Sequence, residues 1–159
     1  MTPEFYHRAN CRLCRGVHLT RVLELPPTPP ANAFVPYRKV AEPQVCYPLD
    51  VYFCETCGHL QLLDVVDPEI LFRDYVYVSG TSPSFVRHFE EYASDCIARF
   101  TPPLGALAID IGSNDGTLLQ FFKVAGMEVL GIDPARQIAA AATARGLETW
   151  PEFLNADMT

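Results

Sequence analysis

One stretch decides the fold of this 159-residue chain: Ala106-Leu107-Ala108-Ile109-Asp110-Ile111-Gly112-Ser113-Asn114-Asp115-Gly116-Thr117. An apolar β-type run ends in an acidic residue, and a turn bracketed by two glycines then leads into a new helical pattern. In a parallel α/β sheet, this order presents backbone N–H groups and a helix N-terminus to a small ligand. The stretch therefore predicts the first strand and the ligand-binding turn of such a sheet.

The sequence after this turn continues to alternate between strand and helix patterns. Strands are predicted at 104–110, 128–133 and 147–149, and helices at 118–125 and 135–145. A glycine follows each of these helices directly, as is common where helices end. This alternation predicts parallel strand pairing with right-handed crossovers.

The segment before the sheet is predicted to contain a capped helical turn at 67–72 and a longer helix that begins at Ser82-Pro83. One apolar face of the longer helix is formed by Phe85, Phe89, Tyr92, Cys96, Ile97 and Phe100. We expect Cys96 to be a core thiol and His88 to be a packing residue. The intervening run from Tyr75 to Ser82 has two interpretations, a loop that faces a ligand or an ordinary strand and turn.

Two C-x-x-C pairs near the N-terminus predict a structural zinc site. The four cysteines are Cys11, Cys14, Cys54 and Cys57. Zinc is bound by four such ligands in a tetrahedron, and one tight C-x-x-C turn supplies two thiolates. We expect Gly58 to relieve the second turn and Gly16, after Arg15, to relieve the first. The alternatives are two unrelated C-x-x-C turns or a redox pair, but no thioredoxin-like βαβ pattern, which a redox pair would need, surrounds these cysteines.

The region around the two turns is predicted to be a small β-rich module. Strands are expected at 19–25, 47–53 and 59–63. Cys46 is expected to be a small buried residue rather than a fifth ligand, and His59 a polar residue on the strand edge.

The composition limits the partners of this protein. A net charge of −7 and only two lysines argue against a nucleic-acid or anionic-membrane partner. Hydrophobic residues make up 49% of the chain, but no apolar run is long enough for a membrane helix or a signal peptide core. We therefore expect a cytosolic, globular protein.

The glycine turn does not suit a dinucleotide. A G-x-G-x-x-G motif that starts at Gly112 would need glycines at Asn114 and Thr117. The pattern present is Asp110-x-Gly112-x-x-x-Gly116, with Asp133 at the end of the next strand. This arrangement is typical of class I S-adenosylmethionine (SAM) methyltransferases, where a carboxylate after the second strand accepts both ribose hydroxyls.

Several motifs together resemble one family. They are the four-cysteine module, Pro30-Ala31-Asn32-Ala33-Phe34, the run from Tyr75 to Ser82, the glycine turn and Gly131-Ile132-Asp133-Pro134. The chain resembles the N-terminal portion of bacterial SAM-dependent sugar C-methyltransferases, which act on nucleotide-linked keto-deoxysugars. The resemblance implies SAM and structural Zn²⁺ as cofactors. It implies cofactor contacts at Tyr75, Ser79, Asp110, Gly112, Ser113, Asn114, Asp115, Gly116, Asp133 and Pro134.

In that family, a base removes the proton next to a ketone, and the enolate attacks the sulfonium methyl group. The family's base lies in later segments, so we expect no catalytic residue within these 159 residues. The expected fold is an α+β zinc-binding module followed by the first part of a Rossmann-like class I methyltransferase α/β domain, with an incomplete parallel sheet. The expected parts are 1–66 for the zinc module, 67–103 for a connecting helical segment with a cofactor-facing loop, and 104–159 for the truncated SAM-binding part.

A truncated sheet leads to further expectations. This fragment alone should not catalyse methyl transfer, and its exposed sheet edge and apolar helix faces favour aggregation or oligomer formation. The alternative is a non-enzymatic zinc-binding module that mediates protein contacts. A nicotinamide-dependent oxidoreductase is disfavoured, because the second and third glycines are missing.

Overall fold

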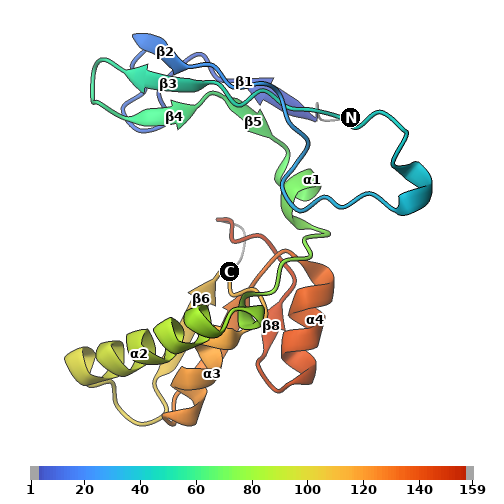
Figure 1. The fold of residues 1–159 in the computed structure, drawn as a ribbon. Coiled ribbons are helices and arrows are strands. Elements are labelled where there is room, and N and C mark those ends of the chain that lie inside the picture. The colour runs from blue at the N-terminus through green and yellow to red at the C-terminus, as the bar shows by residue number, and fades with distance from the viewer. Residues whose placement is uncertain (1–3, 157–159) are drawn as a thin grey trace. The chain divides into compact units, whose positions relative to one another are not determined.

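In the computed structural model, which describes residues 4–156, the chain divides into two units between Leu71 and Phe72 (Figure 1). The first unit contains five short strands and the second contains a parallel sheet with helices. Each unit is described by itself below.

The first unit consists of two small antiparallel sheets. The larger has the order β2-β3-β4, and the smaller pairs β1 with β5. The strands are β1 (Phe5–His7), β2 (Leu19–Leu23), β3 (Val51–Cys54), β4 (Leu60–Leu62) and β5 (Asp64–Val66). A 3₁₀ turn η1 (Tyr37–Lys39) lies in the long connection between β2 and β3, and α1 (Pro68–Phe72) follows β5. The helical turn predicted at 67–72 is confirmed, with the Asp67 carboxylate accepting a hydrogen bond from the backbone N–H of Glu69.

The predicted strand at 47–53 is wrong in its first half. Tyr47 forms only an isolated bridge with Thr28, and the regular strand begins at Val51. Pro48 follows Tyr47 directly and has no N–H to donate to a neighbouring strand, which explains why the ladder does not extend through it. Strands β1 and β5 are further differences, because the sequence interpretation did not include them.

The second unit has the predicted alternation of strands and helices around a parallel sheet. Its strands have the order β6-β7-β8 and all run parallel. The elements are η2 (Ser79–Thr81), α2 (Pro83–Phe100), β6 (Leu107–Ile111), α3 (Thr117–Val124), β7 (Glu128–Ile132), α4 (Arg136–Ala144) and β8 (Thr149–Trp150). The strand predicted from residue 104 begins three residues later, because Gly105 takes a left-handed turn conformation with φ 75°.

A small apolar core joins the helices to the sheet. Leu119 of α3, Ala142 of α4 and Leu147 are buried together, and Val129 of β7 packs against them. The helix α3 packs on β6 and β7, and α4 packs on β8. Leu107, Ile109 and Ile111 alternate along β6 and are all exposed. One side of β6 therefore presents an apolar strip that nothing in the described part of the chain covers.

The predicted apolar face of α2 is only partly correct. Phe89, Cys96 and Ile97 are half-buried and Ala93 is fully buried, but Phe85, Tyr92 and Phe100 are exposed. The cause is that α2 packs mainly against the single helix α3, which covers a narrower strip than the sequence pattern suggests. Cys96 is consequently at the margin of this contact rather than in a core.

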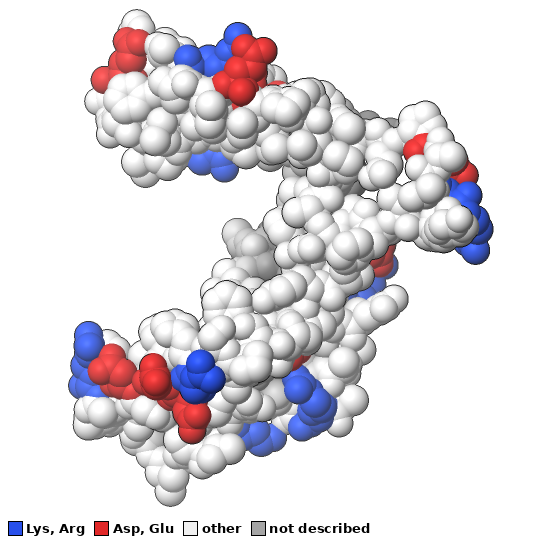
Figure 2. All heavy atoms as spheres, viewed as in Figure 1, with Lys and Arg blue, Asp and Glu red and all other residues white. Residues whose placement is uncertain are grey.

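Charged side chains do not gather into a field of one sign on the face shown in Figure 2. Acidic and basic residues are mixed over α2, where Arg99 forms an ion pair with Asp95 at 3.0 Å. Within the described residues, every helix is too short or too polar to cross a membrane.

Trp150, the single tryptophan of the chain, ends β8. Its carbonyl oxygen accepts a hydrogen bond from the backbone N–H of Asp133 at 3.0 Å, and its indole Nε1 donates to Glu148 at 3.1 Å. The side chain is partly exposed. Trp150 and Asp133 therefore both lie at the carboxyl end of the parallel sheet.

Candidate functional site

The first unit brings its four paired cysteines to one point. Cys11 and Cys14 lie in a turn before β2, Cys54 ends β3, and Cys57 lies in the turn between β3 and β4. All four Sγ atoms lie within 4.8 Å of one another. The Sγ atoms of Cys11 and Cys57 are 3.8 Å apart, and those of Cys14 and Cys54 are 3.6 Å apart.

This geometry fits a tetrahedral zinc ion. With Zn–S bonds of about 2.3 Å, the sulfurs of a regular tetrahedron are about 3.8 Å apart. Cys11 and Cys54 are completely buried, and Cys14 and Cys57 are exposed. The donor set, its spacing and its mixed burial therefore suit structural zinc.

The two cysteine turns share one backbone conformation but use different residues for it. In each turn the fifth residue is left-handed: Arg15 has φ 65° and Gly58 has φ 76°. The expectation that Gly16 relieves the first turn is wrong, because Arg15 takes that conformation itself. Gly16 is needed for space instead, since a Cβ atom there would lie 2.9 Å from Thr56 Oγ1 and 3.2 Å from Cys14 Sγ.

Hydrogen bonds around the cluster favour thiolates. Burial raises the pKa of Cys11, but the backbone N–H groups of Cys14 and Leu13, together with the side chains of Gln61 and Cys54, lower it to about 6. The side-chain oxygen of Gln61 also accepts a hydrogen bond from the backbone N–H of Arg12 at 2.9 Å. The surroundings of Cys11 thus favour its thiolate form, which is the form that binds zinc.

The pKa values of two other cysteines of the cluster, Cys54 and Cys57, shift in different directions. The pKa of Cys54 is lowered, because hydrogen bonds from the backbone of Cys57 and Thr56 outweigh its burial. The backbone N–H of His59 acts to lower the pKa of Cys57, but burial and the neighbouring sulfurs raise it to about 12.

Two further residues were considered as possible neighbours of the zinc site, Cys46 and His59. Cys46 was expected to be buried but is exposed, because it lies in the loop before the isolated bridge at Tyr47 rather than in a strand. Its sulfur lies outside the cysteine cluster and donates to the carbonyl oxygen of Gln44 at 3.7 Å. His59 follows the second turn and contributes its backbone to it, with its carbonyl oxygen accepting from Cys54 N at 2.9 Å.

In the second unit, the glycine turn (residues 112–116) lies next to the carboxyl end of β7. Gly112, Asn114 and Gly116 all have left-handed backbones, with φ of 77°, 50° and 75°. The backbone N–H of Gly112 donates to the carbonyl oxygen of Ile132 at 2.8 Å. These contacts bring the turn beside Asp133, which follows β7.

A cavity of ≈ 160 Å³ borders this turn. It is lined by Ser79, Phe89, Asp110, Gly112, Ser113, Asn114, Thr117 and Leu118. Phe89 comes from α2 and Leu118 from α3, neither of which the sequence indicated as a site residue. Both lie on helices whose apolar residues are equally expected in a core, so no signal distinguished them.

The cavity contains polar groups that have no intramolecular partner among the described residues. Asp110 is half-buried and forms no hydrogen bond or ion pair there, and Ser113 Oγ is buried without a hydrogen-bond partner. Burial, and secondly the negative charge of Asp133, raise the pKa of the Asp110 carboxyl group. A cationic ligand with N–H groups would pair with the Asp110 carboxylate and could donate a hydrogen bond to Ser113 Oγ.

Asp133 is bound by the chain itself. It is 7% exposed, and its carboxylate accepts backbone N–H groups from Asn114 and Ala135, both at 2.8 Å. Each oxygen retains one lone pair for a further donor. Asp133 and the following Pro134 lie outside the lining of the Asp110 cavity.

The run from Tyr75 to Ser82 is a loop with a short 3₁₀ turn, so its interpretation as a strand is wrong. The side chain of Asn114 bonds to Ser79 and Tyr77, and that of Asp115 bonds to Gly80. Ser79 borders the Asp110 cavity.

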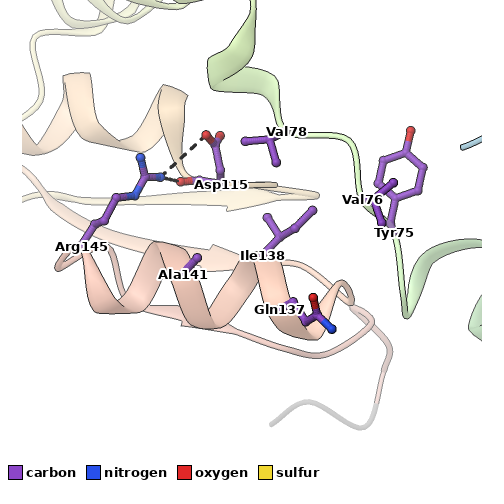
Figure 3. Close-up of a pocket in the computed structure, with 8 residues that line it drawn as sticks. All are labelled: Tyr75, Val76, Val78, Asp115, Gln137, Ile138, Ala141 and Arg145. Carbon is purple, nitrogen blue, oxygen red and sulfur yellow. Dashed lines mark hydrogen bonds and ion pairs between the residues drawn. The ribbon is translucent and has the colours of Figure 1, made fainter. Parts of the chain in front are cut away.

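Tyr75 borders a different cavity, of ≈ 440 Å³ (Figure 3). Its lining consists of Tyr75, Val76, Val78, Asp115, Gln137, Ile138, Ala141 and Arg145. The guanidinium of Arg145 donates to the backbone oxygen of Asp115 and lies 3.8 Å from its carboxylate. Tyr75 and Ser79, which belong to the same loop, thus border two separate cavities.

Comparisons with known proteins concern the four-cysteine unit and the chain as a whole. Residues 11–72 match a family model described as "Putative zinc binding domain". The chain is 34% identical over 148 residues to the C-methyltransferase NovU of Streptomyces niveus, a match that covers 93% of this chain and 35% of that protein. The chain therefore spans about a third of that relative's length.

The two matches confirm the predicted resemblance to the N-terminal portion of a C-methyltransferase. Zinc binding is supported independently by the matched domain and by the convergence of the four cysteines.

Proposed function

We propose that this chain is the N-terminal part of a SAM-dependent C-methyltransferase that acts on a nucleotide-linked keto-deoxysugar. Within it, residues 1–66 would form the structural zinc module, 67–103 the connecting segment with the cofactor-facing loop, and 104–159 the first part of a Rossmann-like cofactor domain. The four cysteines Cys11, Cys14, Cys54 and Cys57 would bind the zinc ion.

The observation that carries this proposal is the unpaired carboxylate of Asp110 in a cavity beside the glycine turn. The amino-acid end of SAM offers an ammonium group, and its sulfonium adds a second positive charge. A half-buried carboxylate next to another acid is stabilised by such a ligand. A dinucleotide would instead bring a negatively charged pyrophosphate towards these two acids.

The size of the cavity suits only part of that ligand. Small-molecule sites commonly measure about 300–1,000 Å³, and this cavity measures ≈ 160 Å³. We assign the amino-acid end of SAM to Ser79, Asp110, Gly112, Ser113 and Gly116. The remaining lone pairs of Asp133, followed by Pro134, are assigned to the ribose.

The bound cofactor would supply an electrophilic methyl group. The proposed reaction removes the proton next to the sugar ketone, and the resulting enolate attacks that methyl carbon. We place no base within this chain: His7 is paired with Asp64 at 3.0 Å, and the ring of His88 lies beside Phe89 and Tyr92. The role of this chain is therefore to bind and orient the cofactor, and we expect it to be inactive alone.

Calorimetric titration with S-adenosylhomocysteine, combined with NMR mapping, tests the cofactor assignment. We expect weak binding, with shifted amide signals at the glycine turn and a loss of at least tenfold in affinity for Asp110→Asn. The control is Asp95→Asn, an exposed carboxylate on α2 that should leave binding unchanged. Unchanged glycine-turn signals at millimolar ligand, or equal binding by Asp110→Asn, would contradict the proposal.

A second function is favoured by the connection between β2 and β3. Phe34 and Tyr37 there are 82% and 94% exposed, which is unusual for aromatic side chains and suits protein contact. Under this alternative the chain is a zinc-binding interaction module. It predicts that Phe34→Ser and Tyr37→Ser abolish capture of a partner protein, while S-adenosylhomocysteine does not bind.

A further inference from the structure

The loop from Tyr77 to Gly80 is held on the glycine turn by the side chain of Asn114. Asn114 Oδ1 accepts the backbone N–H of Ser79 at 2.9 Å, and Nδ2 donates to the carbonyl oxygen of Tyr77 at 2.9 Å. A primary amide offers one acceptor and donors on adjacent atoms, so it satisfies both loop groups at once. A carboxylate in its place could not donate to Tyr77.

The next residue makes a second connection to the same loop. Asp115 is 6% exposed, and its Oδ2 accepts the backbone N–H of Gly80 at 3.3 Å. Its other oxygen accepts from both the backbone N–H and the hydroxyl of Thr117, at 3.2 and 2.7 Å. Asp115 therefore connects the loop to the first turn of α3.

Gly80 leaves no room between the loop and the turn. A Cβ atom at this position would lie 2.7 Å from Asp115 Oδ2 and 2.8 Å from Thr117 Oγ1. Because both atoms belong to a hydrogen-bonded and largely buried group, they cannot move away at low cost. The contact thus depends on glycine for space as well as on the two polar side chains.

Asn114 also connects this loop to Asp133. Its backbone N–H donates to Asp133 Oδ2 at 2.8 Å, and its left-handed backbone, with φ 50°, directs its side chain to the loop. A ligand that binds Asp133 would therefore contact a carboxylate that is hydrogen-bonded to Asn114, the residue that also holds Ser79.

We propose that Asn114 and Asp115 are positioning residues, whose side chains hold the Tyr77–Gly80 loop so that Ser79 forms a wall of the Asp110 cavity. Their side chains serve the loop rather than the ligand. The identity of that ligand as the SAM cofactor rests on the proposed function, but the loop contact does not. Cofactor binding and the order of the loop are then coupled through Asn114.

Amide hydrogen exchange of the ligand-free chain tests the loop contact directly. Asn114→Gly removes the side chain but keeps a residue suited to the left-handed backbone. We expect exchange at the Ser79 amide to become at least tenfold faster, while the α3–α4 core exchanges as before. Gly80→Ala should have the same effect at Ser79 through steric displacement.

The matched control is Asn32→Gly, the same substitution at another left-handed asparagine, with φ 60°, in the first unit. It should leave the Ser79 amide unchanged. The double variant Asn114→Gly/Gly80→Ala should be no worse at Ser79 than the stronger single variant, because both act on one contact. Unchanged exchange at Ser79 in Asn114→Gly, or additive effects in the double variant, would refute the positioning role.

Addition of S-adenosylhomocysteine separates this proposal from the proposed function. We expect the ligand to slow Ser79 exchange in the unchanged chain but not in Asn114→Gly, whose affinity should fall about three- to tenfold. An affinity loss above about a hundredfold with normal Ser79 exchange would make Asn114 a direct ligand contact and overturn the proposal. If the unchanged chain does not bind the ligand, the proposed function fails, and the ligand-free exchange rates still decide the loop contact.

Discussion

The cysteine cluster and the glycine turn both gather potential ligand groups, but they use them differently. In the cluster all four Sγ atoms converge within 4.8 Å. At the turn, the carboxylates of Asp115 and Asp133 accept backbone N–H groups of the chain, and only Asp110 has neither a hydrogen bond nor an ion pair among the described residues. An acidic motif therefore indicates a ligand site only after the donors within the protein have been assigned.

The largest effect is expected from a substitution in the cysteine cluster. Cys54→Ser should abolish zinc binding, which contributes about 10–16 kcal/mol in small zinc domains, and should therefore unfold the first unit. Elemental analysis should find about one zinc per unchanged chain and none in the variant, with loss of the amide dispersion of β2–β4.

Cys46→Ser is the matched control for that experiment, because Cys46 is exposed and lies outside the cluster. It should retain both zinc and stability. A Cys54→Ser variant that remains folded at full stability would show that the cluster is not a structural metal site.

A smaller effect tests the carboxylates at the glycine turn. Asp133→Ala should lower the free energy of unfolding of the second unit by about 2–4 kcal/mol, because it leaves two backbone N–H groups without an acceptor. Asp133→Asn, which keeps one acceptor oxygen, should lose less. Chemical denaturation measures both values, and a change below about 0.5 kcal/mol for Asp133→Ala would mean that these hydrogen bonds do not stabilise the turn.

The two cysteine turns provide a comparison within the cluster. Gly58→Ala should cost about 1–2 kcal/mol from left-handed strain alone, since a Cβ atom there meets nothing within 4 Å. Arg15→Gly should be neutral or stabilise by up to about 1 kcal/mol, because it relieves the same strain in the first turn. Denaturation of the zinc-loaded first unit measures these effects, and the opposite order would exclude backbone strain as their cause.

The smallest expected effect is a pH dependence that originates at Asp110. Burial and Asp133 raise its pKa above the ordinary value of 3.8, so the folded state binds more protons than the unfolded state above that pH. Stability of the second unit should therefore fall as the pH rises through the raised pKa, by less than about 1 kcal/mol after solvent screening. Asp110→Asn should remove this slope, and a slope that persists in the variant would assign it to another group.

The features that the sequence predicted well depend on local patterns. The C-x-x-C spacing and the strand–glycine–helix order are such patterns, and the structure contains both the cysteine cluster and the parallel sheet. Strands β1 and β5 were missed because each has three residues, too few for alternation to be recognised.

The features that could not be predicted depend on contacts between distant residues. The hydrogen bonds from a loop 35 residues earlier in the chain to the side chains of Asn114 and Asp115 were not predicted, because no local pattern links the two segments. The roles of Arg15 and Gly16 were exchanged because the need for a small residue came from Thr56 across the cluster, not from the local backbone. Burial of Cys46 was wrong because the strand predicted next to it begins only at Val51.

The single tryptophan makes the two halves of the molecule optically distinct. Trp150 belongs to the second unit and lies one hydrogen bond from Asp133, whereas the first unit contains tyrosines but no indole. Fluorescence excited at the red edge of the absorption band therefore reports on the α/β unit alone. Cobalt substituted at the cysteines would report on the other unit through its thiolate charge-transfer bands. One sample, observed at two wavelengths, can thus reveal whether the zinc module and the α/β unit unfold together or in succession.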